Sequence, residues 1–121
     1  MYRSVLIVDD HDGFRTQVRA LLDAAGYQVV GEAGDGTTGI AEATRLAPDL
    51  VLLDVQLPDI SGFDVARRLR EHDGSTAIVL ISSRDRSDYG ARIDRSGADG
   101  FISKSELSAR ALDAILQARA S

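Results

Sequence analysis

Short aliphatic runs alternate with amphipathic segments along the chain, and most of the runs end on a polar side chain. The runs at residues 5–8, 50–53 and 78–81 consist entirely of Val, Leu and Ile, and a shorter apolar run follows at 101–102. Continuous aliphatic runs of this length are typical of parallel strands that are buried on both faces. The pattern therefore predicts a sheet whose strands carry polar groups to one edge.

The periodicity predicts five strands and five helices. We expect strands at about residues 4–8, 28–33, 50–53, 77–81 and 100–102. We expect helices at about 14–25, 37–46, 61–71, 87–95 and 107–119, where apolar positions recur at helical spacing. Ser61 and Ser105 are the expected N-caps of the third and fifth helices, because a serine hydroxyl accepts hydrogen bonds from free N–H groups of the first turn. The fourth helix is the least apolar, and its interior holds Gly90.

This alternation predicts an α/β domain with a parallel sheet, and right-handed crossovers put helices on both of its faces. In open sheets of this kind, ligands bind beyond the carboxyl ends of the strands, at a switch in strand order. The polar residues that follow the aliphatic runs all fall at that edge: Asp9, Asp10, Asp54, Ser82 and Lys104.

Three carboxylates, a hydroxyl and an amine are the groups that a site for a phosphoryl group and a divalent cation needs. Asp54 can attack a phosphoryl group and form an aspartyl-phosphate. Such a transfer depends mostly on positioning and on neutralising charge. Mg²⁺ prefers oxygen ligands, which Asp9 and Asp10 offer. Lys104 would contact a second phosphoryl oxygen and Ser82 a third.

Each of these residues also has an ordinary structural explanation when it is taken alone. An Asp pair after a strand often forms a turn and a helix cap, and a lysine at a strand end is usually solvated. His11 and His72 are expected on the surface, with no second ligand spaced for zinc. The evidence for one site is that four strand ends each carry the kind of group that such a site requires.

Composition narrows the functional classes. The chain of 121 residues is long enough for one domain with a core. It has no Cys, which excludes disulfides and thiol nucleophiles. Its net charge of −5 argues against direct nucleic-acid binding by this chain. No apolar run approaches the roughly 18 residues of a membrane span, and the N-terminus shows no secretory pattern, so we expect a cytoplasmic protein without a membrane partner.

The motifs together resemble the receiver domain of two-component response regulators, over essentially all of residues 1–121. The matching segments are VLIVDD at 5–10, LLDVQLPDISG at 52–62, SS at 82–83 and GADGFISK at 97–104. The resemblance implies a flavodoxin-like (βα)5 doubly wound parallel sheet with strand order 2-1-3-4-5. The GFISKSEL stretch is similar to receivers of the LuxR-type subfamily, which usually carry a C-terminal DNA-binding helix-turn-helix that this chain does not contain.

The resemblance also implies a role for each site residue. Asp54 is identified as the phosphoacceptor, and Ser82 and Lys104 as the hydroxyl and the amine that contact the phosphate. Mg²⁺ would be bound by Asp10, Asp54 and the Gln56 backbone carbonyl, with Asp9 assisting through water. Ser82 and Phe101 would be the switch residues.

The implied partners are a sensor histidine kinase or phosphotransfer protein, and an output domain or partner protein. The output surface would comprise the fourth helix, fifth strand and fifth helix, and homodimerisation on phosphorylation stays open. The chain would catalyse only its own phosphorylation and dephosphorylation. Because Gly90 lies inside the expected fourth helix, Gly90→Ala is predicted to raise stability and to reduce the response of that helix.

Some positions depart from the family pattern. Ser105 stands where many members have Pro, and Phe101 stands where Tyr is commoner. Arg84 is an uncommon bulky cation near the expected site, and together with Gln56 it could influence the access of water to the phosphate.

Three alternatives remain open at this point. A haloacid-dehalogenase-like phosphatase would need an Asp at position 56, where this chain has Gln. A flavin carrier would need a hydroxyl- and glycine-rich loop after the first strand, where this chain has three acidic residues between 9 and 12. A receiver that is never phosphorylated and acts as an interaction module would keep the same fold.

Overall fold

The computed structural model describes residues 3–120. The two ends of the predicted domain, residues 1 and 121, lie outside the described residues. Five parallel strands form one sheet in the order β2-β1-β3-β4-β5. This order is the one that the resemblance implied. The sequence changes direction across the sheet between β1 and β3, so the carboxyl ends of these two strands flank the switch point where ligands bind in such folds.

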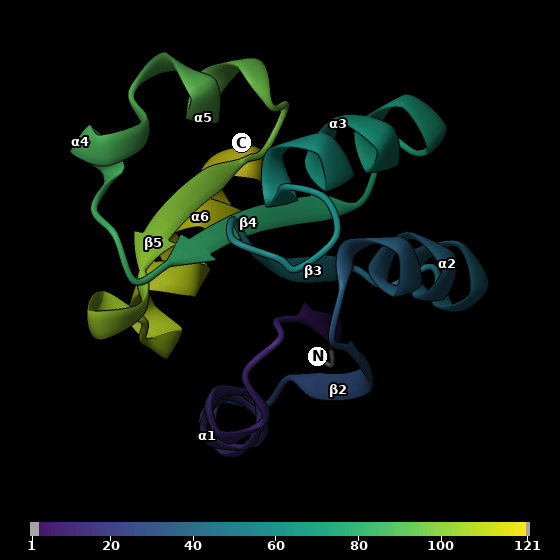
Figure 1. Cartoon of the computed structure of the whole chain (residues 1–121). Helices are drawn as coiled ribbons and strands as arrows, with labels where there is room; N and C mark the ends of the chain where they lie inside the picture. The colour runs from purple at the N-terminus through teal and green to yellow at the C-terminus, as the bar shows by residue number, and fades with distance from the viewer. Residues whose placement is uncertain (1–2, 121) are drawn as a thin grey trace.

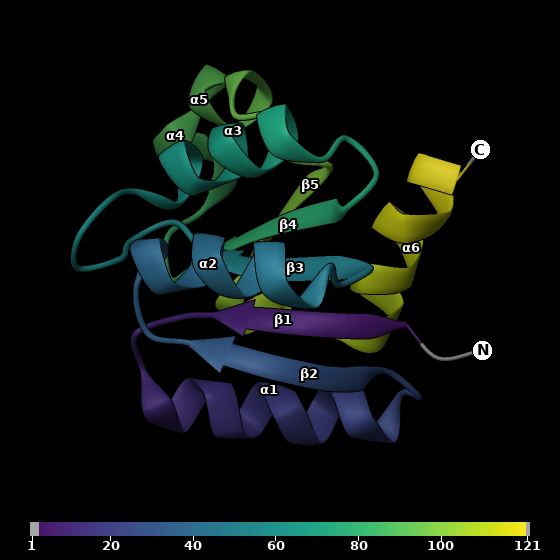
Figure 2. The same ribbon diagram turned by 90° about the vertical axis from the view of Figure 1, so that its right-hand side faces the viewer.

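The strands and helices follow one another in the predicted alternation (Figures 1 and 2). The strands are β1 (Ser4–Val8), β2 (Gln28–Ala33), β3 (Leu50–Asp54), β4 (Ala77–Ser82) and β5 (Gly100–Ser103). The helices are α1 (Asp12–Ala24), α2 (Gly36–Leu46), α3 (Gly62–His72), α4 (Arg86–Tyr89), α5 (Ala91–Arg95) and α6 (Ala109–Ala120), with a 3₁₀ turn at Lys104–Glu106.

Two hydrophobic clusters cover the two faces of the sheet. Successive strand residues point to opposite faces, so Leu6 belongs to the cluster under α2, α3, α4 and α5, whereas Ile7 belongs to the cluster under α1 and α6. β3 and β4 are buried along their whole length. The aliphatic runs were therefore correctly predicted as central strands, and they form the rigid base that carries the site.

The predicted fourth helix is wrong as a single element. Residues 86–95 form two short helices, α4 and α5, separated at Gly90. Gly90 has a φ of 54° and a ψ of −131°, a conformation that only glycine adopts readily. The chain therefore uses Gly90 to break the helix.

The predicted start of the last helix is also wrong. Ser105 lies within the 3₁₀ turn, and α6 begins at Ala109. Ser108 supplies the N-terminal hydrogen bond, because its Oγ accepts from Ala111 N at 3.1 Å. The other predicted cap is correct: Ser61 Oγ accepts from the backbone N–H groups of Phe63 and Asp64 at the start of α3.

The amino edge of the sheet is held by one neutralised carboxylate. Asp99, just before β5, accepts from Arg70 on α3 at 2.9 Å and from Arg119 on α6 at 2.8 Å. It also accepts from Ile78 N at 2.8 Å. Because α3 and α6 lie on opposite faces, this side chain links both helical layers to the sheet.

Candidate functional site

Asp54 is the last residue of β3, and its side chain is almost completely buried at the carboxyl edge of the sheet. Its Oδ1 accepts a hydrogen bond from Gln56 N at 3.1 Å. The loop after it turns back tightly, with Gly62 N donating to Val55 O at 2.7 Å. A Cβ on Gly62 would overlap the Asp54 carbonyl oxygen and lie 2.8 Å from Val55 Cα. A glycine at this position therefore lets the loop close over the end of β3.

Asp9 follows β1 and is fully buried beside Asp54. Its Oδ1 accepts from His11 N at 2.8 Å, so half of the carboxylate is used to shape the loop. Its Oδ2 is buried and receives no hydrogen bond from the described residues. A buried carboxylate oxygen without a hydrogen bond is costly unless a cation lies near it.

Lys104 supplies the nearby positive charge. Its Nζ lies 2.8 Å from Asp9 Oδ2 and 3.2 Å from Asp54 Oδ2, so one ammonium group is shared by two carboxylates. The contact with Asp54 has hydrogen-bond geometry, whereas the contact with Asp9 is an ion pair only. The ammonium also lies 4.3 Å from the centre of the Phe14 ring, an arrangement that favours a cation.

The electrostatics show that the carboxylates are not fully neutralised. Burial raises the pKa of Asp54, the Asp9 charge raises it further, and the opposing effect of Lys104 does not cancel the increase. Burial alone would lower the pKa of Lys104, but the carboxylates of Asp9 and Asp54 outweigh that effect and raise it. A second cation at this edge would therefore stabilise the ionised form of Asp54.

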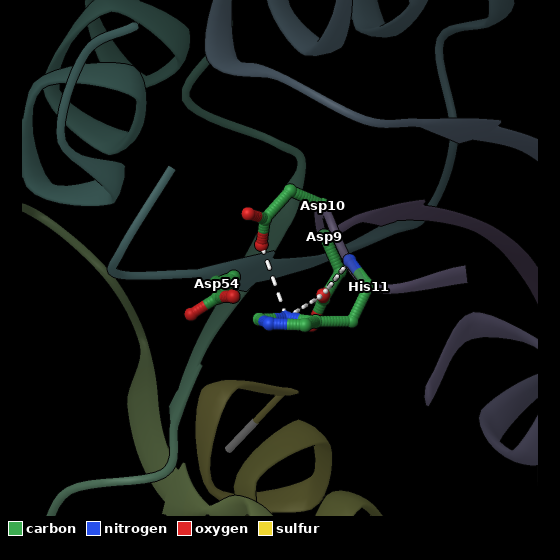
Figure 3. A group of neighbouring side chains, drawn as sticks. All are labelled: Asp9, Asp10, His11 and Asp54. Atoms are coloured by element: carbon green, nitrogen blue, oxygen red, sulfur yellow. Dashed lines mark hydrogen bonds and ion pairs between the residues drawn. The ribbon is translucent and has the colours of Figure 1, made fainter. Parts of the chain in front are cut away.

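Asp10 and His11 complete a cluster of possible metal ligands with Asp9 and Asp54 (Figure 3). One ligand atom from each of the four residues lies within 4.8 Å of the others. His11 Nδ1 is 3.2 Å from Asp9 Oδ1 and 3.1 Å from Asp10 Oδ1. The acidic oxygens, including the buried Asp9 Oδ2, fit a hard divalent cation such as Mg²⁺.

His11 was predicted as a surface residue, and its side chain is indeed exposed. Its position beside the acids was missed, because the prediction considered only sequence spacings typical of zinc. The residue directly follows the acid pair, and that adjacency was the signal that could have placed it.

Ser82 and Phe101 lie on the neighbouring strands β4 and β5, and both are buried. Ser82 ends β4, which pairs with β3 up to Asp54 and Ile81. Ser82 Oγ is bonded to Tyr89 OH at 2.7 Å and accepts from Arg84 N at 3.1 Å. Ser82 therefore sits on the strand next to Asp54, but its hydroxyl is engaged with α4.

Tyr89 is the other residue that sequence reasoning missed, since it was counted only as an apolar position. Its ring makes edge contacts with Phe63, at 5.3 Å between centroids, and with Phe101, at 5.7 Å. Arg84 is exposed, and it lines a surface pocket together with Gln56, Tyr89 and Arg92. Arg84 and Gln56 thus line one pocket, and their influence on the access of water to a phosphoryl group stays a prediction.

The match to a known family covers this whole arrangement. The model of the response regulator receiver domain matches residues 5–117. The chain belongs to this family. Response regulator GacA of Pseudomonas aeruginosa is 38% identical over 101 residues, which are 83% of this chain and 47% of GacA. The chain spans about half the length of the curated relatives it matches.

Solved receiver structures have the same fold. A LuxR-family two-component response regulator from Aurantimonas sp. SI85-9A1 superposes with a TM-score of 0.89 at 30% identity, over 99% of this chain and 86% of that one. The response regulator domain of Thermotoga maritima CheB gives 0.83 at 25% identity, over 100% of this chain and 98% of that one. The receiver fold and the two-component context are therefore established. None of the helices described for this receiver is long and apolar enough to cross a membrane.

Proposed function

We propose that this receiver accepts a phosphoryl group on Asp54 from a phosphohistidine of a histidine kinase or phosphotransfer protein. The supporting observation is the shared ammonium of Lys104, which lies between the buried carboxylates of Asp9 and Asp54. This arrangement holds Asp54 at the edge of the sheet next to a positive charge that can also contact a phosphoryl oxygen. Such a site fits a negatively charged phosphoryl group that binds together with a divalent cation.

In the proposed transfer, a carboxylate oxygen of Asp54 attacks phosphorus while the phosphorus–nitrogen bond of the donor breaks. The electron pair of that bond returns to the imidazole nitrogen, and the product is an aspartyl-phosphate. Lys104 would exchange part of its contact with Asp54 for a phosphoryl oxygen, and the Ser82 hydroxyl would donate to another. Attack by water on phosphorus would later release inorganic phosphate and restore the Asp54 carboxylate.

The proposed metal site consists of Asp9, Asp10, Asp54 and the Gln56 backbone carbonyl, with Asp9 acting through water. The contribution of bound Mg²⁺ is neutralisation of the carboxylates and of the phosphoryl oxygens. In this structure Lys104 bridges the carboxylates of Asp9 and Asp54, and His11 lies between those of Asp9 and Asp10. Asp9 also fixes the loop through its bond from His11 N, so that Asp10 stays at the exposed side of the cluster.

The proposed output surface consists of α4, α5, β5 and α6. Phosphorylation adds charge and acceptor oxygens at Asp54, which would draw Ser82 and Lys104 toward them. Phe101, the switch residue implied by the family resemblance, lies on β5 opposite Leu80 of β4, and its ring contacts Tyr89. The chain would then act on an output domain or a partner protein in the cytoplasm, with homodimerisation through this surface as one form of output.

The test is the intact mass of the protein after incubation with acetyl phosphate and Mg²⁺. The wild type should gain about 80 Da, the mass of one phosphoryl group, and Asp54→Ala should gain nothing. Asp64→Ala is a matched control, because Asp64 is a solvent-accessible carboxylate on α3 away from the acid cluster. A wild type that gains no mass and binds no BeF₃⁻ would instead support an interaction module that is never phosphorylated.

A further inference from the structure

The hydroxyl of Ser82 is held by a buried hydrogen bond from outside the acid cluster. Ser82 Oγ and Tyr89 OH are 2.7 Å apart, and either atom could be the donor by distance alone. Ser82 Oγ also accepts from Arg84 N at 3.1 Å. Ser82 is 1% exposed and Tyr89 is 8% exposed. Both side chains are therefore buried, and Tyr89 also lines the surface pocket beside Arg84.

Each hydroxyl has one proton to donate. If Tyr89 were the donor, the Ser82 proton would need another acceptor, and none of the described contacts supplies one to this buried side chain. If Ser82 is the donor, its proton is satisfied, and Tyr89 is the residue of the pair that lines a surface pocket beside Gln56 and Arg84, where water can accept its proton. A buried donor without an acceptor is the costlier arrangement. The structure therefore favours Ser82 as the donor to Tyr89.

This assignment sets up a competition for one proton. Phosphoryl oxygens only accept hydrogen bonds, so Ser82 must donate its single O–H to contact a phosphoryl group on Asp54. That proton is already donated to Tyr89. The Ser82 hydroxyl cannot satisfy both acceptors, and the bond to Tyr89 must be lost or reversed when the phosphoryl group arrives.

Tyr89 is well placed to transmit that change. It is the last residue of α4 and is followed directly by Gly90, where the chain breaks before α5. Its ring lies against Phe63 of α3 and Phe101 of β5. A change at the phenol therefore acts on the segment 86–95 and on the ring of Phe101 together.

We propose that Tyr89 is a positioning residue that holds the Ser82 hydroxyl away from the phosphorylation site and releases it when Asp54 is phosphorylated. This inference rests on the proposed function. Tyr89 touches neither Asp54 nor Lys104 in the described contacts, so it acts through Ser82. Phe101 cannot take this role, because its ring carries no hydroxyl that could bond to Ser82.

The test compares the affinity of the wild type and of Tyr89→Phe for BeF₃⁻ in the presence of Mg²⁺, by titration followed in ¹H–¹⁵N spectra. Phe keeps the ring contacts and removes the acceptor, so binding should become roughly three- to ten-fold tighter, the equivalent of one net hydrogen bond. In a Ser82→Ala background the same substitution should have no effect, because the proton in question is absent. Tyr27→Phe is the matched control: Tyr27 directly precedes β2 at the amino edge of the sheet, opposite the acid cluster, and its phenol donates to Asp113 of α6. It should leave BeF₃⁻ affinity unchanged.

Hydrogen exchange gives a second readout that does not depend on affinity. BeF₃⁻ should speed exchange at residues 86–95 of the wild type, and Tyr89→Phe should show the faster exchange before BeF₃⁻ is added. Equal BeF₃⁻ affinity of the wild type and Tyr89→Phe would overturn the proposed role of Tyr89 and leave the proposed function of Asp54 intact. A gain in affinity that persists in the Ser82→Ala background would do the same. A wild type that binds no BeF₃⁻ would overturn the proposed function and this inference with it.

Discussion

The acids at the two edges of the sheet are neutralised to different degrees. At the amino edge, the partly buried carboxylate of Asp99 is paired with Arg70 and Arg119 and also accepts from a backbone N–H group. At the carboxyl edge, the buried carboxylates of Asp9 and Asp54 share the ammonium of Lys104, and Asp9 Oδ2 receives no hydrogen bond from the residues between 3 and 120.

Asp99 is therefore expected to stabilise the fold, whereas the acids at the carboxyl edge are expected to lower its stability. A fully satisfied carboxylate joins helices on both faces to the sheet. Crowded carboxylates repel one another in the absence of further cations, so they cost stability. Proteins retain arrangements of this second kind where a site needs them. The same substitution, Asp to Asn, should therefore have opposite effects at the two edges.

The largest expected effect comes from disrupting the close backbone packing at the carboxyl edge. Gly62→Ala should lower the free energy of unfolding by about 3 kcal/mol, because the new Cβ would meet the backbone of Asp54 and Val55 rather than a movable side chain. Urea denaturation measures this change. Gly13→Ala is the control, since a Cβ there meets nothing within 4 Å inside α1 and should raise stability slightly. Equal effects of the two substitutions would contradict the close approach at Gly62.

The next effect tests the amino edge. Asp99→Asn should lower the free energy of unfolding by about 2 kcal/mol, since two arginines lose their charged partner. Asp64→Asn, which affects one solvent-accessible pair with Arg67, should change stability by less than about 0.5 kcal/mol. If Asp99→Asn were as mild as its control in chemical denaturation, the amino edge would not be the stabilising one.

A smaller effect of opposite sign is expected at the carboxyl edge. Burial, and then the charge of Asp9, raise the pKa of Asp54. A raised folded-state pKa adds stability while the group is protonated, and this stability is lost as pH rises through that pKa. At neutral pH, Asp54→Asn should therefore raise the free energy of unfolding, and the gain should shrink as pH falls through the folded-state pKa of Asp54.

Melting curves at several pH values measure the Asp54→Asn effect. Millimolar Mg²⁺ should narrow the difference between the two proteins, because an ion bound by the native acids stabilises the wild type. If Asp54→Asn were less stable than the wild type at neutral pH, the expected opposite effects at the two edges would be contradicted.

The smallest effect concerns the break between α4 and α5. Gly90→Ala should lower the free energy of unfolding by about 1 kcal/mol, because Gly90 has a φ of 54° that a residue with a Cβ adopts only with strain. This reverses the expectation drawn from a continuous helix. Thermal melts decide the sign, and Gly74→Ala, which meets nothing within 4 Å, is a control in a surface turn. A stabilised Gly90→Ala would show that residues 86–95 can form one helix.

The alternating pattern was enough to predict the strands and the edge of the sheet where the polar residues gather. Runs such as residues 50–53 are typical of strands buried on both faces, and a parallel sheet puts all of their carboxyl ends on one side. Asp9, Asp10, Asp54 and Lys104 were therefore placed together correctly from their positions alone. Short irregular segments were not predicted as well, since Ser105 and Ser108 are equally good caps by composition.

The sequence by itself determined which residues arrive at the carboxyl edge, because strand periodicity is a local property of the chain. Only the tertiary structure decided how their protons and charges are shared. Tyr89 meets Ser82 because Gly90 ends α4 one residue later and the rings of Phe63 and Phe101 hold the phenol in place. Contacts of this kind depend on the packing of several elements at once, and no pattern within one element encodes them.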